Sequence, residues 1–187
     1  MLEKKIALLT SVTFNNIGNG FIDLGAEAAL MKALPLNAEL FKVSSNANFA
    51  ATMGQMFMLK ENPIINWLWV HTMQRAAKKL HDRSYKTVKT QNIFSMASMV
   101  KCDYFIIPGC VLTVPFFTIY GDLIKRKAEQ GSKIIFLGAS GNFYTEYEVK
   151  FVSEYLRKLR PYAIMTRDIL AYKYYANFTT NSYHGID

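Results

Sequence analysis

The sequence of 187 residues contains few residues of the types that build disulfide frameworks and metal sites: two cysteines and three histidines. Cys102 and Cys110 do not form a CxxC pair, and no histidines and cysteines cluster with the spacing of a zinc site. This pattern indicates that both cysteines are small core or loop residues rather than ligands or disulfide partners. Such usage is typical of a protein of the reducing cytoplasm, with no bound metal.

Long apolar runs are also missing. The most apolar internal run, residues 63–70, is far shorter than the roughly 20 residues that a membrane-spanning helix needs. The apolar run near the N-terminus breaks at Thr10 and Ser11, and no small-residue cleavage site follows it, so it does not fit a signal peptide. We therefore expect a soluble, cytoplasmic protein.

Charged residues make up only 19% of the chain, whereas hydrophobic residues make up 51%, which is enough for a core. The net charge of +8 favours anionic partners such as phosphorylated substrates or nucleotides, although a basic protein without a special partner explains it equally well. The densest basic stretches, residues 75–83 and 150–160, have helical spacing. No nucleic-acid-binding motif accompanies them, so solvated helix faces are favoured and no nucleic-acid partner is expected.

Short apolar runs alternate with longer amphipathic ones along most of the chain. The runs predict strands at residues 5–10, 39–43, 103–107, 133–137 and 162–166, and helices at 21–33, 116–130, 146–160 and 169–175. Residues 44–92 are harder to interpret, with helices expected at 49–60 and 64–80 and an edge strand at 86–90; a short helix is expected at 93–100. Strands joined by helices of this length imply right-handed parallel crossovers. We therefore predict an α/β fold, a Rossmann-like doubly wound parallel sheet in a single domain over residues 1–187.

Ligands of such sheets bind at the carboxyl ends of the strands, which selects the loops at residues 13–20, 109–114, 138–144 and 167–168. The first loop carries five candidate binding residues: Asn15, Asn16, Gly18, Asn19 and Gly20. Its glycines would let the backbone approach a ligand, and amides at the next helix would face an anion. The loop has neither the dinucleotide fingerprint nor the P-loop pattern. A polar turn that only caps the helix is the alternative.

Further candidates lie near the other strand ends. Asp23, in the first turn of the helix predicted at 21–33, is either a partner of the helix dipole or a site carboxylate. Gly109, Gly138 and Ser140 end two strands, and the glycines would make room for a ligand. Glycine is common in any turn from a strand to a helix, so each of these matches is weak by itself.

Arg167 and Asp168 follow a predicted strand directly. An arginine at that position can bind a carboxylate or phosphate through two parallel hydrogen bonds. The equally weighted alternative is a local pair in which Asp168 caps the next helix. The three histidines are far apart, and neither a catalytic triad nor a GxSxG turn is visible, so a self-contained hydrolase is disfavoured.

The order of these motifs resembles the polysaccharide pyruvyl transferase family. The matching segments are Asn15–Gly25 with the opening asparagine-glycine motif, Cys102–Gly109 with the "aD-strand-GG" element, Lys133–Gly138 with the next strand and glycine turn, and Ile164–Asp168 with the "strand-Arg-Asp" element. The chain departs from the pattern where Cys110 replaces a second glycine. It also stops near the point where the family crosses into a second domain, so the resemblance implies the N-terminal half of a glycosyltransferase-B-type protein.

That resemblance implies transfer of a pyruvyl group from phosphoenolpyruvate onto two hydroxyls of a sugar, with Arg167 contacting the anionic donor and with no cofactor. Two other hypotheses stay open: a non-catalytic module that binds a nucleotide or a partner chain, and a small flavodoxin-like enzyme complete in itself. A domain without its partner should expose an apolar surface through which it could also form a homo-oligomer. The aromatic tail is the candidate for that surface, with residues 172–175, Phe178 and Tyr183.

Overall fold

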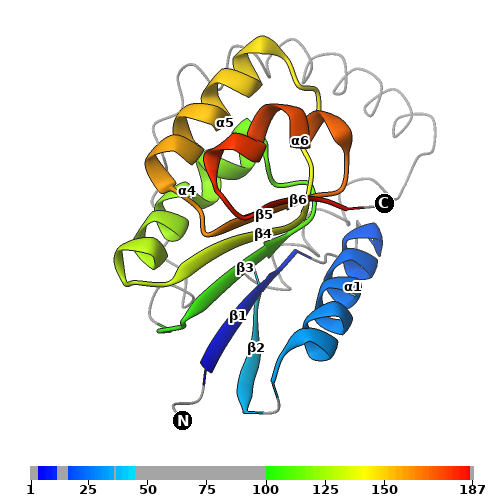
Figure 1. Cartoon of the computed structure of the whole chain (residues 1–187), viewed down its shortest axis with the longest axis vertical. Coiled ribbons are helices and arrows are strands. Elements are labelled where there is room, and N and C mark those ends of the chain that lie inside the picture. The colour runs from blue at the N-terminus through cyan, green and yellow to red at the C-terminus, as the bar shows by residue number, and fades with distance from the viewer. Residues whose placement is uncertain (1–3, 12–16, 36, 45–99, 186–187) are drawn as a thin grey trace, which may run out of the picture. The chain divides into compact units, whose positions relative to one another are not determined.

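The computed structural model describes residues 4–11, 17–35, 37–44 and 100–185. They form a six-stranded parallel sheet in the order β2-β1-β3-β4-β5-β6, with helices on both faces (Figure 1). The elements are β1 (Lys4–Thr10), α1 (Ile17–Ala33), β2 (Ala38–Ser44), β3 (Tyr104–Pro108), α4 (Val114–Glu129), β4 (Lys133–Ala139), α5 (Glu146–Leu159), β5 (Ala163–Thr166), α6 (Ile169–Tyr175), the 3-10 turn η2 (Ala176–Phe178) and β6 (Ser182–His184). The predicted α/β fold class, a Rossmann-like doubly wound sheet, is confirmed.

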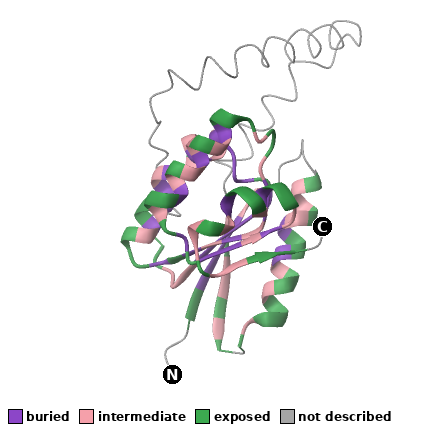
Figure 2. Cartoon of the chain, turned by 45° about the horizontal axis from the view of Figure 1, so that its top comes forward, coloured by how far each residue is buried: buried purple, intermediate pink, exposed green. Residues whose placement is uncertain are grey.

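The core consists of two apolar layers, one on each face of the sheet. Successive side chains of a strand point to opposite faces, so Phe105 and Ile107 pack with the layer under α4, α5 and α6, whereas Ile106 packs with Ala26 of α1. Buried residues accordingly follow the strands and the sheet-facing sides of the helices (Figure 2).

The strand order places a topological switch point between β1 and β3. The chain moves from β1 to β2 on one side, and from β3 it continues through β4 and β5 on the other side. Because all neighbouring strands are parallel, their carboxyl ends meet at one edge of the sheet, which we call the carboxyl edge. Open α/β sheets bind ligands at this edge.

Two helices begin earlier than predicted. Helix α1 begins at Ile17, so Gly18, Asn19 and Gly20 lie in its first turn and not in the predicted loop 13–20. A glycine costs a helix roughly 1 kcal/mol, and packing of the helix against the sheet outweighs this. Helix α4 begins at Val114 rather than at residue 116, because Thr113 caps it and proline is tolerated in a first turn.

The C-terminal segment differs most from the prediction. It adds β6, a short strand that pairs with β5 and was not predicted from three residues without a clear alternation. The expected exposed aromatic tail is wrong for Tyr175, which is fully buried, and for Phe178, which packs against the core. Tyr183 is 57% exposed. Tyr174 is also exposed, and other large exposed apolar side chains include Ile169 on α6 and Phe21, Leu24 and Met31 on α1.

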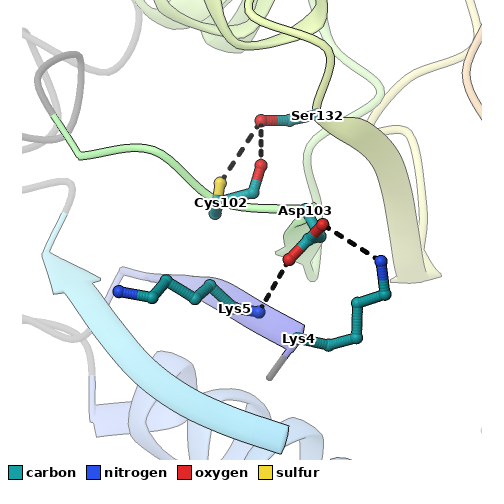
Figure 3. A network of polar contacts seen from close by, with 5 residues as sticks. All are labelled: Lys4, Lys5, Cys102, Asp103 and Ser132. Atoms are coloured by element: carbon teal, nitrogen blue, oxygen red, sulfur yellow. Dashed lines mark hydrogen bonds and ion pairs between the residues drawn. The ribbon is translucent and has the colours of Figure 1, made fainter. Parts of the chain in front are cut away.

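The edge opposite the carboxyl edge is held by the segment that precedes β3 (Figure 3). The Asp103 carboxylate accepts a hydrogen bond from the Lys5 amide at 2.9 Å and lies 3.3 Å from the Lys4 ammonium, and these contacts lower the pKa of Asp103. The Ser132 hydroxyl donates to the Cys102 carbonyl at 2.6 Å. Residues 102–103, which carry part of the family resemblance, thus join β1, β3 and β4 far from the carboxyl edge.

Some predictions fall outside the described residues. They are the helices at 49–60 and 64–80, the edge strand at 86–90 and, apart from Val100, the helix at 93–100. Within the described part of the chain, no helix combines the length and the apolar character needed to cross a membrane.

Candidate functional site

Of the loop between β1 and α1, the structure describes only Ser11, so Asn15 and Asn16 lie outside the described residues. Asp23 is buried in α1, and its Oδ2 accepts a hydrogen bond from the Ser11 amide at 2.8 Å. The Asn19 side-chain amide donates to the Ser11 carbonyl at 3.1 Å. Both side chains therefore fix the end of β1 to the first turns of α1, and a ligand contact by either one stays a prediction.

The loop after β3 combines a packed glycine with an exposed thiol. Gly109 has a φ of +92°, and a Cβ added there would lie 3.3 Å from a side-chain carbon of Ile22, so backbone conformation and close packing on α1 both favour glycine. Cys110 is exposed, and its thiol donates to the Gly141 carbonyl at 3.1 Å. The position where the family resemblance leads us to expect a second glycine thus carries a thiol at the carboxyl edge.

The end of β4 is joined to the loop after β3 by the backbone of Ser140. Gly138 has a φ of +56° at the point where the register between β4 and β5 shifts. Beyond this irregularity, the Ser140 amide donates to the Gly109 carbonyl at 3.1 Å and its carbonyl accepts from the Leu112 amide at 3.0 Å. Ser140 is buried, so its hydroxyl has a defined place beside the end of β5.

Arg167 follows β5 and is bound to the end of β4 through its backbone and its side chain. Its amide donates to the Ala139 carbonyl at 3.2 Å, and its Nε donates to the Ser140 hydroxyl at 3.1 Å. Ser140 and Arg167, two residues selected from the sequence separately, are therefore in direct contact. Arg167 is half-buried, and its guanidinium places a positive charge at the carboxyl edge.

Asp168 has the capping role that was one of its two predicted roles. It is the N-cap of α6, and its carboxylate accepts a hydrogen bond from the Ala171 amide at 2.8 Å. Both carboxylate oxygens also accept from the Tyr144 hydroxyl, at 2.8 and 2.7 Å. This carboxylate is therefore occupied by the start of α6 and by the loop after β4.

Tyr144 and Glu148 are central to the arrangement and were not selected from the sequence. The Tyr144 hydroxyl accepts from the Gly141 amide at 2.7 Å, and burial together with the Asp168 carboxylate raises the pKa of Tyr144. Glu148 is buried and accepts from the Phe143 and Tyr144 amides at 3.0 and 2.7 Å. The T-x-x-E spacing of Thr145 and Glu148 is a capping-box pattern that could have revealed Glu148, whereas no sequence signal distinguishes Tyr144.

The assembled groups suit an anion. A fixed arginine and a buried serine hydroxyl lie beside one another, and α4, α5 and α6 all begin at this edge, where helix dipoles favour negative charge. Among the described residues, no three histidine, cysteine, aspartate or glutamate side chains gather in a way that could hold a metal ion.

Comparison of the chain with protein-family models, with curated proteins and with solved structures finds no match. The chemistry of the carboxyl edge is therefore the basis for the proposal that follows.

Proposed function

We propose that the carboxyl edge binds a small phosphorylated carboxylate of the phosphoenolpyruvate type, and that the chain supplies the donor half of a polysaccharide pyruvyl transferase-like site. The observation that carries this proposal is the Arg167 side chain, which the Ser140 hydroxyl holds at the ends of β4 and β5. A guanidinium can bind a carboxylate or a phosphate through two parallel hydrogen bonds. The net charge of +8 would attract such a donor.

The proposed reaction needs positive charge at this place. Two sugar hydroxyl oxygens would bond to the central carbon of phosphoenolpyruvate as its phosphate leaves. One hydroxyl proton would go to the methylene carbon, which becomes a methyl group, and the other would leave with the phosphate. Negative charge develops on the departing phosphate, and a preorganised cation stabilises that transition state more than the ground state.

A second candidate function, a binding module without catalysis, is favoured by a specific observation. Asp23, Glu148 and Asp168 are carboxylates near the carboxyl edge, and each accepts at least one hydrogen bond from a backbone amide. They stabilise the fold and are poorly placed to exchange protons with a substrate. In this alternative, the same arginine would hold an anionic ligand or a nucleotide that is not transformed.

Calorimetric titration of the full chain with phosphoenolpyruvate, and separately with nucleotide sugars, tests the proposal. We expect phosphoenolpyruvate to bind and Arg167→Ala to weaken it by roughly 10- to 100-fold, since a hydrogen-bonded charged pair contributes about 1.5–3 kcal/mol. Arg167→Lys keeps the charge but loses the planar fork, so an intermediate affinity is expected. Arg126→Ala, an exposed arginine in the last turn of α4, removes the same charge at the opposite edge and should leave the affinity unchanged.

The alternatives give different results. An equal loss of affinity in Arg126→Ala and Arg167→Ala would mean that only net charge attracts the donor, which contradicts a site at Arg167. Binding of a nucleotide sugar but not of phosphoenolpyruvate would favour the binding module. A folded chain that binds neither ligand would refute the donor site.

A further inference from the structure

Two side-chain bonds run next to each other between the loop after β4 and the start of α6. The first joins Arg167 to Ser140 at 3.1 Å. The second joins Asp168 to Tyr144, whose hydroxyl also accepts from the Gly141 amide at 2.7 Å. The bonds connect neighbouring residues: Asp168 follows Arg167, and Gly141, whose amide binds the Tyr144 hydroxyl, follows Ser140. Both bonds therefore join the same two backbone segments, the loop after β4 and the start of α6.

The Tyr144 side chain is held in this place from several directions. Its backbone has a φ of +50°, a conformation that costs a non-glycine residue about 1 kcal/mol or more. Glu148 fixes that conformation by accepting the Tyr144 amide at 2.7 Å, and the ring stacks on Tyr174 with centroids 6.0 Å apart. A strained backbone conformation of this kind persists where the surrounding contacts hold it in place.

The Tyr144 hydroxyl also determines what the Asp168 carboxylate binds. Both oxygens of Asp168 accept from Tyr144, and Oδ1 accepts from the Ala171 amide as well. With the hydroxyl in place, Asp168 is directed toward α6 and Arg167 toward Ser140.

We propose that Tyr144 is a positioning residue of the anion site: by holding the Gly141 amide and the Asp168 carboxylate together, it sets the place of the Arg167 guanidinium beside Ser140. Only the affinity measurement described below depends on the donor site proposed above. The place of Arg167 can be measured without any ligand.

The first measurement is made without ligand. Tyr144→Phe keeps the ring and removes the hydroxyl, and nitrogen-15 NMR of the full chain reports the exchange of the Arg167 Nε proton with water. Ser140→Ala removes the hydroxyl that accepts that proton and gives the exchange rate without this hydrogen bond. We expect Tyr144→Phe to accelerate exchange about tenfold toward the Ser140→Ala rate. The matched control Tyr147→Phe, an exposed tyrosine in the first turn of α5, should exchange as the wild type does.

The second measurement is calorimetric titration with phosphoenolpyruvate. Tyr144→Phe should bind about tenfold more weakly than the wild type, whereas Tyr147→Phe should bind equally well. Urea unfolding of both variants separates this effect from stability. If Tyr144 only stabilised the fold, Tyr144→Phe would lower the free energy of unfolding and leave Arg167 exchange in the folded chain unchanged.

Wild-type exchange of the Arg167 Nε proton in Tyr144→Phe would overturn the positioning role, whatever happens to stability. If the wild type does not bind phosphoenolpyruvate, the proposed function fails, and the exchange rates still decide the role of Tyr144. Faster exchange together with unchanged affinity would show that Arg167 moves without consequence for the ligand, which would also overturn the inference.

Discussion

At the scale of single residues, the carboxyl edge needs a glycine beside a large aromatic side chain. Tyr144 lies across Gly141, where an added Cβ would be 2.6 Å from a ring carbon, closer than such atoms approach one another. Gly25 provides the contrast, since it lies on the exposed side of α1 with nothing within 4 Å of an added Cβ. The same substitution should therefore have opposite effects at the two positions.

Gly141→Ala should lower the free energy of unfolding by about 1–3 kcal/mol, because the Tyr144 ring must move away from its two hydrogen bonds. Gly25→Ala should raise the free energy of unfolding by about 0.5–1 kcal/mol, since alanine is the better helix former. Urea unfolding measures both changes. Similar stabilities of Gly141→Ala and the wild type would mean that the ring can move without cost.

At the scale of an element, α5 begins with a capping arrangement that also shapes the site. The Thr145 hydroxyl accepts from the Glu148 amide at 3.2 Å, as in a capping box. The Glu148 carboxylate reaches back to the Phe143 and Tyr144 amides. The start of the helix and the conformation of the loop after β4 therefore depend on the same buried carboxylate.

Glu148→Ala should lower the free energy of unfolding by about 2–3 kcal/mol, because two partly buried amides lose a charged acceptor. Thr145→Ala should cost about 1 kcal/mol, the usual effect of losing an N-cap. Glu154→Ala, an exposed glutamate in the middle of α5, should change stability by less than about 0.5 kcal/mol. Equal losses at positions 145 and 148 in urea unfolding would show that only the cap matters.

At the scale of the whole molecule, tyrosines on the α4–α6 face couple stability to alkaline pH. Burial raises the pKa of Tyr144, Tyr155 and Tyr175 above the ordinary value of 10.0. A raised folded-state pKa means that the folded chain holds its phenolic protons longer than the unfolded chain. The stability that these groups contribute is therefore complete below pH 10 and is lost as the pH rises above it. Burial lowers the pKa of Lys127 below its ordinary value of 10.5, because the charged ammonium is poorly solvated there. The destabilisation caused by burying this charge therefore decreases as the pH rises toward 10.5.

Tyr155→Phe removes the hydroxyl of one of these tyrosines and keeps its ring. The ring can still stack on Phe117, and the two ring centroids lie 4.2 Å apart. We expect the difference in unfolding free energy between wild type and variant to be constant from about pH 8 to about pH 10 and to shrink above it. Urea unfolding along a pH series measures it. A difference that stays constant well above pH 10 would contradict the raised pKa.

The sequence was sufficient where a local pattern and its tertiary setting agreed. Five strands and the helices near residues 146–160 and 169–175 were predicted, and the Asp168 cap was one of two equally weighted interpretations. Apolar runs and capping residues express local preferences that packing reinforced. Strand β6 and the early start of α1 were missed, because neighbouring strands and the sheet surface stabilise them rather than their own residues. Among the site residues, Arg167 and Ser140 were selected with the rule on strand ends. The same rule selected the loop 138–144, but no sequence signal singled out Tyr144 within it.

The sequence by itself therefore determined that this chain is an α/β protein, and it determined which strand ends carry polar groups. Both follow from local features of the sequence, the spacing of apolar residues and the identity of turn residues. Only the tertiary structure decided which of those polar groups meet. Ser140 and Arg167 come together because β4 and β5 are parallel neighbours. Tyr144 meets Asp168 because the loop after β4 and the start of α6 lie at the same edge of the sheet. Contacts between distant segments depend on strand order and register, and a local sequence pattern does not contain either.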